Sequence, residues 1–254
     1  AVGVFSGRGF TWTREGGFVP LDPPPQLGIA VAQSVNGDGS VVVGGLSGTL
    51  NAFRRTGTGV YEDLGRPLGG QYTGSFARAV SRDGAVVAGA AQRTVSGGSS
   101  RSEAFRWSAA SGTLALGFAR PAHDVSIALD ANADGSVLVG QSFQNSSGLG
   151  DAFVWTPQGG TEPLPALNGS LFSGASTVSA DGRFVGGLSD SKAVIWDRAS
   201  GSIRVIPPGG GVPQPSGVAA ISDDASVAAG TTSGVSYVWR EGVGTQRLTD
   251  YLLA

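Results

Sequence analysis

The sequence of 254 residues contains no cysteine, no methionine and a single histidine. The lack of cysteine excludes a disulfide scaffold and thiolate metal sites. No run of 18 apolar residues occurs, so no transmembrane helix is expected. Charged residues make up 14% and the net charge is −2, which argues against a nucleic-acid-binding surface. Because methionine is missing even at position 1 and no signal peptide is visible, we expect an internal or processed piece of a longer protein.

Glycine, by contrast, is abundant, with 43 residues, and it marks a repeated unit. One copy begins at the turn Asp134-Gly135, continues through an apolar run that ends at Gly140, and closes with a second apolar run that ends at Trp155. Six copies follow one another, and the first lacks its front end. The glycine stands at positions 3, 44, 89, 140, 187 and 230, and the closing residue at positions 12, 55, 107, 155, 196 and 239, which is Arg at 55 and Trp elsewhere.

The spacings of the repeat separate scaffold from surface loop. Successive glycines are 41 to 51 residues apart, a period typical of stacked units and, among all-β folds, of propeller blades. The distance from the closing residue to the next turn stays between 26 and 28, whereas the distance from glycine to closing residue varies from 9 to 18. Packing constrains scaffold lengths but not exposed loops, so the variable segment is expected to be a surface hairpin.

Each copy is expected to form four strands, A to D, with the Asp-Gly turn between A and B. Strand B is a continuous apolar run such as Val41–Val43, which indicates burial on both faces. Strand C carries Phe and Trp two residues apart, so both should face the neighbouring unit. We therefore predict an all-β, six-bladed β-propeller whose first blade lacks its N-terminal strand. A seven-bladed ring and an open solenoid are the alternatives. The expected single domain, 1–254, divides into repeats at about 1–26, 27–72, 73–122, 123–168, 169–212 and 213–254.

The variable B–C loops and the D–A connections are expected on one rim of the propeller. The longest B–C loops span 90–101 and 141–150. A rigid scaffold with variable loops on one side is a common design of binding surfaces, although such loops can also simply tolerate insertions. The candidate ligand-binding residues on this rim are Arg93, Arg101, Arg120, His123, Asp124, Gln144 and Asn145.

Catalytic residues are not predicted. A Ser–His–Asp site would need His123, whose neighbour is Asp124, but adjacent side chains seldom converge and no Gly-x-Ser-x-Gly motif occurs. A solvated loop histidine is the simpler interpretation. Dinucleotide, phosphate-loop and zinc motifs are also missing, so no cofactor is expected.

A calcium site is the one metal hypothesis that the sequence suggests. Asp130, Asn132 and Asp134 alternate as in the first half of a calcium loop and precede Gly135. The expected bidentate glutamate is missing, because position 141 is Gln. A plain hairpin turn is the alternative.

The repeated pattern Val-Ser-x-Asp-Gly followed by x-Ala-Phe-x-Trp resembles the bacterial extracellular HAF repeats, named for a His-Ala-Phe at the start of strand C. The matching residues here are Asn51-Ala52-Phe53, Glu103-Ala104-Phe105 and Asp151-Ala152-Phe153; the His is absent from every copy. The resemblance covers nearly the whole chain. It implies export to the surface of a Gram-negative cell, as in autotransporter passenger domains, but no defined activity.

Three functions follow as hypotheses. The first is a secreted or cell-surface, adhesin-like propeller that binds carbohydrate or a host protein through its loop rim. The second is a propeller hydrolase or lyase that acts on polysaccharide or ester substrates. The third is a passive spacer in a larger exported protein. A monomer with no nucleic-acid partner is expected in each case.

Overall fold

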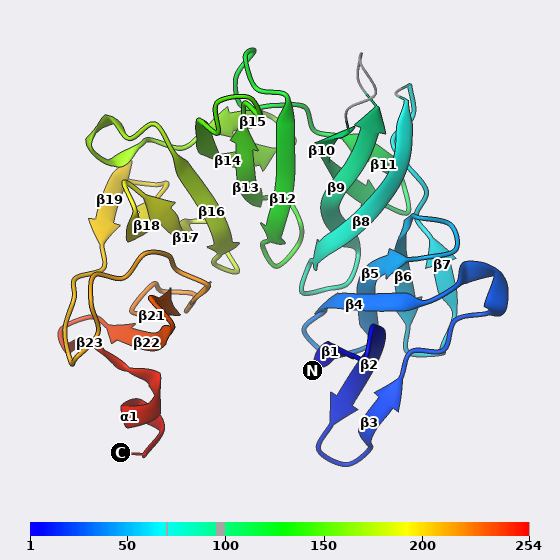
Figure 1. Ribbon diagram of the computed structural model, residues 1–254, viewed down its shortest axis with the longest axis horizontal. Coiled ribbons are helices and arrows are strands. Elements are labelled where there is room, and N and C mark those ends of the chain that lie inside the picture. The colour runs from blue at the N-terminus through cyan, green and yellow to red at the C-terminus, as the bar shows by residue number, and fades with distance from the viewer. Residues whose placement is uncertain (70, 95–99, 254) are drawn as a thin grey trace.

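The computed structural model describes residues 1–69, 71–94 and 100–253, and almost all of its regular structure is β-strand (Figure 1). The strands form six antiparallel sheets, of which five have four strands and one has three. The sheets follow one another along an arc, with strands β4, β8, β12 and β16 on its inner side (Figure 1). The fold is thus a six-bladed β-propeller in which, among the described residues, the first blade has three strands, and the prediction from the repeats is confirmed.

The first three blades occupy the N-terminal half. Blade 1 consists of β1 (Val2–Phe5), β2 (Arg8–Thr13) and β3 (Gly17–Pro20), which take positions B, C and D. Blade 2 consists of β4 (Ala30–Val35), β5 (Val41–Leu46), β6 (Ala52–Thr56) and β7 (Tyr61–Asp63). Blade 3 consists of β8 (Tyr72–Val80), β9 (Val86–Thr94), β10 (Ser100–Ser108) and β11 (Gly112–Ala115).

The last three blades repeat the same order of strands. Blade 4 consists of β12 (Val125–Ala131), β13 (Leu138–Phe143), β14 (Gly150–Thr156) and β15 (Gly160–Pro163). Blade 5 consists of β16 (Ser173–Val178), β17 (Phe184–Ser189), β18 (Lys192–Asp197) and β19 (Ser202–Val205). Blade 6 consists of β20 (Ala220–Ile221), β21 (Val227–Thr232), β22 (Val235–Arg240) and β23 (Gly244–Arg247).

Three short helical segments were not predicted. The 3₁₀ turns η1 (Pro25–Leu27) and η2 (Leu167–Gly169) lie in D–A connections, and helix α1 (Leu248–Leu253) follows the last strand and packs on blade 6. Six residues are too few to show helical periodicity, and a helix of this length depends on such packing. None of the helices in the described ranges is long and apolar enough to cross a membrane.

Blade-to-blade packing is built from one apolar cluster at each junction. Phe105 and Trp107 of blade 3, for example, pack with Val41, Val43 and Leu64 of blade 2. Four further clusters join blades 1 and 2, 3 and 4, 4 and 5, and 5 and 6, but among the described residues no cluster joins blade 6 to blade 1. The expectation that strand C faces a neighbouring blade is therefore confirmed for blades 2 to 6, and the structure shows that this neighbour is the preceding blade.

The first blade is the exception. Trp12 is 40% exposed, whereas Trp196 at the same position of blade 5 is 2% exposed. The expectation that the Trp of strand C packs against a neighbouring unit is wrong for Trp12, because no preceding blade covers this face of blade 1 in the part of the chain that the structure describes.

The two rims of the propeller differ as predicted. On one rim the A–B turns of neighbouring blades bond to each other, since the Gly37 amide donates to the Arg82 carbonyl and the Asp83 amide to the Ala133 carbonyl. On the other rim the B–C hairpins of blades 2, 3 and 4 bond to the connection that enters the same blade; Asp124, for example, donates its amide to the carbonyl of Phe143. The loop-bearing rim is thus held by contacts between loops.

The predicted loop 90–101 is mostly strand. Strands β9 and β10 extend beyond the length of the other hairpins and pair as far as Thr94 and Ser100. The tip of this loop, 95–99, lies outside the described residues. The second predicted loop, 141–150, keeps a free tip between Phe143 and Gly150.

Candidate functional site

The candidate site lies on the loop rim between blades 3 and 4. Three segments meet there: the β9–β10 hairpin, the connection from β11 to β12, and the start of the β13–β14 hairpin. The connection carries three of the predicted residues within five positions, so the fold brings them beside both hairpins. The rim cluster, as we name it, comprises Arg101, Arg120, His123, Asp124, Ser142, Asn145 and Asp151.

The inner part of the rim cluster is an arginine–carboxylate pair. Arg120 Nε donates to Asp151 Oδ2 at 2.5 Å, and Arg120 Nη2 donates to Asp151 Oδ1 at 3.2 Å. This two-point geometry is the strong form of the pair, and the hydrogen bond that Arg120 donates to Asp151 raises the pKa of Arg120. The Asp151 side chain is largely buried, whereas that of Arg120 is 55% exposed. The pair therefore offers guanidinium surface to a ligand while it holds the arginine in place.

His123 lies directly beneath this pair. Its Nδ1 is 2.9 Å from Ser142 Oγ, its Nε2 is 3.7 Å from Asp151 Oδ2, and its side chain is 7% exposed. Burial lowers the pKa of His123, and the nearby Asp151 carboxylate opposes that effect. The prediction of a solvated loop histidine is therefore wrong. The tertiary fold buries the imidazole ring among the other residues of the rim cluster, including Ser142 and Asp151.

Ser142, His123 and Asp151 have the residue types of a nucleophilic triad, but a substrate cannot reach Ser142. Ser142 is fully buried, and its Oγ accepts the amide N–H of Ala119 at 3.1 Å. A nucleophile must reach a substrate carbonyl. Ser142 instead fixes the connection that carries Arg120 and His123.

The outer part of the rim cluster is centred on Asp124. Arg101 Nε donates to Asp124 Oδ2 at 2.9 Å, and the amide of Asn145 donates to Asp124 Oδ1 at 2.8 Å. These two hydrogen bonds hold the pKa of Asp124 below its usual value, and the bond from the Asn145 amide has the larger effect. Asp124 thus links the β9–β10 hairpin to the tip of the β13–β14 hairpin.

Two predicted residues lie outside the rim cluster. Arg93 is 3.5 Å from the Glu103 carboxylate and lies over the ring of Phe118 at 5.1 Å. Tyr72 donates to the same Glu103 carboxylate, and burial followed by the Glu103 charge raises the pKa of Tyr72 to about 12. Gln144 accepts a hydrogen bond from Ser147 within its own loop.

Sequence reasoning missed Ser142 and Asp151 as members of the site. A signal for Asp151 was present, because Asn51, Glu103 and Asp151 all stand directly before the Ala-Phe pair of strand C. In the structure each of the three meets an arginine: Arg66 for Asn51, Arg93 for Glu103 and Arg120 for Asp151. The position that carries His in the resembled repeats thus faces the loop rim here.

The proposed calcium ligands do not converge on one point. Asp130 accepts the amides of Ala131 and of Val178 on blade 5. Asn132 caps the amide of Val137, and Asp134 accepts both the amide and the hydroxyl of Ser136. Burial raises the pKa of Asp130. Within the described ranges no group of three or more His, Cys, Asp or Glu side chains forms a metal cluster, so this geometry favours the hairpin-turn alternative.

Apolar side chains border the rim cluster. Gly150, which precedes Asp151, pairs with Phe172 of the next connection, and its amide donates to the carbonyl of Leu171. Leu149, Leu171 and Phe172 are all exposed. The site therefore combines an exposed guanidinium, a carboxylate and an aromatic edge on a braced rim.

Comparison with known proteins places the chain at the level of fold. No protein-family profile matches the sequence, and no curated protein matches it. Among solved structures, a putative TolB from Agrobacterium tumefaciens is similar with a TM-score of 0.55 and 15% identity, over 94% of this chain and 86% of that one. Dipeptidyl peptidase 4 from Porphyromonas gingivalis has a TM-score of 0.59 and 10% identity, over 95% of this chain and 42% of that one.

A nidogen/laminin complex provides a third similar chain, with a TM-score of 0.52 and 10% identity over 95% of this chain and 90% of that one. At such low identity the likeness shows the fold alone, because one propeller scaffold carries many unrelated functions. The chain is, on its own strand order and on these comparisons, a six-bladed β-propeller.

Proposed function

We propose that this chain is a secreted or cell-surface propeller domain that binds carbohydrate through the rim cluster between blades 3 and 4. The carrying observation is the pair of Arg120 and Asp151, which is braced from below by His123 and open to solvent through the guanidinium. Paired guanidinium and carboxylate groups hydrogen-bond the hydroxyls of a sugar, and they are held rigidly enough to avoid a large ordering cost on binding.

The apolar border supports a sugar ligand in particular. Phe172 and Leu171 lie beside Asp151 through the pairing of Gly150. An aromatic or aliphatic edge next to polar groups suits the mixed polar and apolar surface of a pyranose. The surface location is part of the same proposal and rests on the resemblance to HAF repeats.

The test begins with a glycan array, followed by calorimetry of Arg120→Gln with any glycan that binds. We expect at least a tenfold loss of affinity, since a hydrogen bond from a charged group contributes about 1.5–3 kcal/mol. Arg183→Gln is the matched control. Arg183 forms the same two-point pair with Asp197, at 2.9 and 2.8 Å, and is 48% exposed, but it follows an A–B turn on the opposite rim.

Unchanged affinity in Arg120→Gln, or an equal loss in Arg183→Gln, would contradict the proposed site. If no glycan binds but a host protein does, and Arg120→Gln abolishes that binding, the site holds and its ligand class changes. Absence of any binding would favour the passive spacer. Protease accessibility of the protein on intact cells tests the surface location separately.

A further inference from the structure

The inner face of the propeller carries a second group of residues suited to a ligand. There the A strands of blades 2 to 5, which are β4, β8, β12 and β16, lie side by side (Figure 1). Each of them bulges at the same step of its pairing with strand B, and the extra residues are Gln33, Arg78, Leu129 and Ser176. The four blades share the bulge, but its side chain is an amide, a guanidinium, an aliphatic group or a hydroxyl. The scaffold therefore requires the bulge and leaves the choice of side chain open.

Arg78, the charged residue of this series, is held in place by two neighbours. With the Gln33 amide oriented so that its oxygen faces Arg78, this oxygen accepts a hydrogen bond from Arg78 Nη1 at 3.2 Å, and the Gln33 nitrogen donates to the Ala32 carbonyl at 3.3 Å. The guanidinium carbon of Arg78 also lies over the Phe76 ring, 5.2 Å from its centroid. A cation–π contact fixes the side chain without neutralising its charge.

The opposite edge of the Arg78 guanidinium is open to a ligand. The Arg78 residue is exposed. Among the described residues, ion pairs with Asp or Glu include six other arginines but not Arg78. Since Gln33 takes Nη1, the Nε and Nη2 groups remain, and these two groups together can donate two parallel hydrogen bonds to one carboxylate.

A glycine of blade 2 makes room for the Phe76 ring. A β-carbon on Gly45 would lie 2.3 Å from Phe76 Cδ2, so the ring can lie against β5 only because this residue is glycine. At the junction of blades 4 and 5 the sizes are reversed. There Gly174 holds the repeat position of Phe76, and a β-carbon on it would lie 2.3 Å from Nε2 of Gln141, which holds the position of Gly45. The aromatic ring is thus a feature of the junction between blades 2 and 3.

A cavity of about 370 Å³ is lined by Arg78 and Phe76. Its other lining residues come from blades 2, 3 and 4 and include the apolar Ile127 and the polar Gln92 and Ser102. Arg78 is the one charged residue of this lining within the described ranges, and no carboxylate belongs to it. A volume of this size falls within the range of small-molecule sites.

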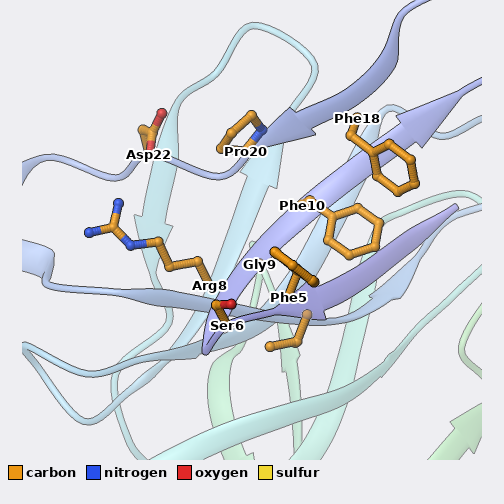
Figure 2. Close-up of a pocket in the computed structure, with 9 residues that line it drawn as sticks. Phe5, Ser6, Arg8, Gly9, Phe10, Phe18, Pro20 and Asp22 are labelled. Carbon is orange, nitrogen blue, oxygen red and sulfur yellow. The ribbon is translucent and has the colours of Figure 1, made fainter.

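The larger cavity on blade 1 differs from the inner cavity in its charges. It has a volume of about 840 Å³, and Figure 2 shows its Arg8 and Asp22 on one side and the rings of Phe10 and Phe18 on the other. Because its charged residues have opposite signs, that cavity favours neither sign of ligand. The inner cavity has a positive charge alone and therefore favours an anion.

The inner cavity is separate from the rim cluster. Gln92 pairs with Ser102, and the next pair along the β9–β10 hairpin is Arg93 with Arg101. Successive pairs direct their side chains to opposite faces of a hairpin. Gln92 and Ser102 line the cavity, whereas Arg101 donates to Asp124 of the rim cluster. The two sites therefore lie on opposite faces of one hairpin.

We propose that the inner cavity binds a sugar acid of the hexuronate class. The carboxylate pairs with Nε and Nη2 of Arg78, and the ring hydroxyls form hydrogen bonds with Gln92 and Ser102. The apolar C–H face of the pyranose contacts Phe76 and Ile127. This site uses no residue of the rim cluster, so it goes beyond the proposed function and does not depend on it.

Calorimetric titration of the 254-residue protein with D-glucuronate tests the site, and D-glucose, which lacks the carboxylate, is the matched ligand. We expect saturable binding of glucuronate, and affinity for glucose lower by about tenfold or more. Arg78→Gln should weaken glucuronate binding by about tenfold or more, because the charge-assisted pair is lost.

Arg82→Gln is the control variant. Arg82 is also exposed but lies in the A–B turn of the same blade, on the rim opposite to the loops. It should change the affinity for glucuronate by less than about twofold, as should Arg120→Gln, because neither residue lines the cavity. Circular dichroism and thermal melts of each variant, compared with the parent, show whether the fold is kept.

Several outcomes would overturn the inference. They are a failure of glucuronate to bind at millimolar concentration, equal affinity for glucose, and unchanged affinity in a folded Arg78→Gln. If Arg120→Gln weakened glucuronate as strongly as Arg78→Gln, the sugar acid would belong to the rim cluster instead. Inorganic phosphate that binds as tightly and displaces glucuronate would replace the sugar acid with oxyanions in general.

Discussion

The tryptophan of strand C lies in opposite environments in blades 1 and 5. Trp196 is buried against blade 4 and its indole N–H donates to the carbonyl of Pro165 at 2.8 Å. Trp12 occupies the same place in the repeat but is half exposed, since no other blade packs against this face within the described ranges. Both strands carry the Trp at the same place in the repeat, so the contrast shows that burial here is supplied by the preceding blade and not by the residue itself.

The largest expected difference between the two blades is the loss of unfolding free energy when the Trp of strand C is replaced by Ala. Trp196→Ala should lower the free energy of unfolding by about 3–5 kcal/mol, because it leaves a cavity between blades and an unsatisfied carbonyl. Trp12→Ala should cost less than about 1 kcal/mol, since the ring is already half in solvent. Urea unfolding followed by circular dichroism measures both. Similar losses in the two variants would contradict the packing contrast.

The glycine that ends the first apolar run of each copy, in strand B, should give the next largest difference. Gly187→Ala places a methyl group against the carbonyl of Gly174, and we expect a loss of about 1–3 kcal/mol from overpacking. Gly3→Ala meets only the Phe10 ring, which can turn aside, so its cost should stay below about 1 kcal/mol. The same urea experiment applies. A Gly3→Ala variant as unstable as Gly187→Ala would show that β1 is already covered in solution.

His123 of blade 4 should make a smaller, pH-dependent contribution to the free energy of unfolding. Blade 1 cannot show this effect, because Phe5 occupies the repeat position of Ser142, the hydrogen-bond partner of His123. Burial lowers the pKa of His123 below 6.5, so between these two pKa values the unfolded chain binds more protons than the folded one. Stability should therefore fall as the pH drops through 6.5 and level off below the folded pKa.

His123→Asn removes this contribution, and the difference in unfolding free energy between parent and variant should shrink as the pH falls from 7 to 5. A difference that is constant over this range would indicate that His123 titrates alike in both states. Thermal melts at intervals of half a pH unit provide the measurement.

Calcium should have the smallest effect. The A–B turn of blade 4 uses its Asp134 and Asn132 oxygens for hydrogen bonds of its own. We expect no change in the midpoint of thermal unfolding on addition of millimolar calcium. A rise that Asp134→Ala removes would instead establish the calcium site that the alternating oxygens suggested.

Much of the fold could be predicted because the repeat encodes it six times. The Gly series and the strand C aromatics set the number of blades, and the constant spacing from Trp to the next turn separated scaffold from loop. The sequence also predicted which rim carries the candidate ligand residues. Successive connections in an antiparallel meander lie on opposite rims, so the B–C loops and the D–A connections must share one rim. Five of the seven predicted residues meet there: Arg101, Arg120, His123, Asp124 and Asn145.

Other features required contacts that no local pattern carries. Arg120 and Asp151 are 31 residues apart, and only the return of the β13–β14 hairpin beside its entering connection joins them. The length of the β9–β10 hairpin and the helix at Leu248–Leu253 depend likewise on neighbours in space.

The amino-acid sequence by itself determined the blade, because strand period, turn chemistry and the glycine of strand B act within some forty residues. Only the tertiary structure decided which copies of one motif are covered. Trp12 and Phe5 differ from their counterparts in exposure because burial depends on whether a neighbouring blade or strand lies against them, and that is a property of position in the assembly and not of residue type.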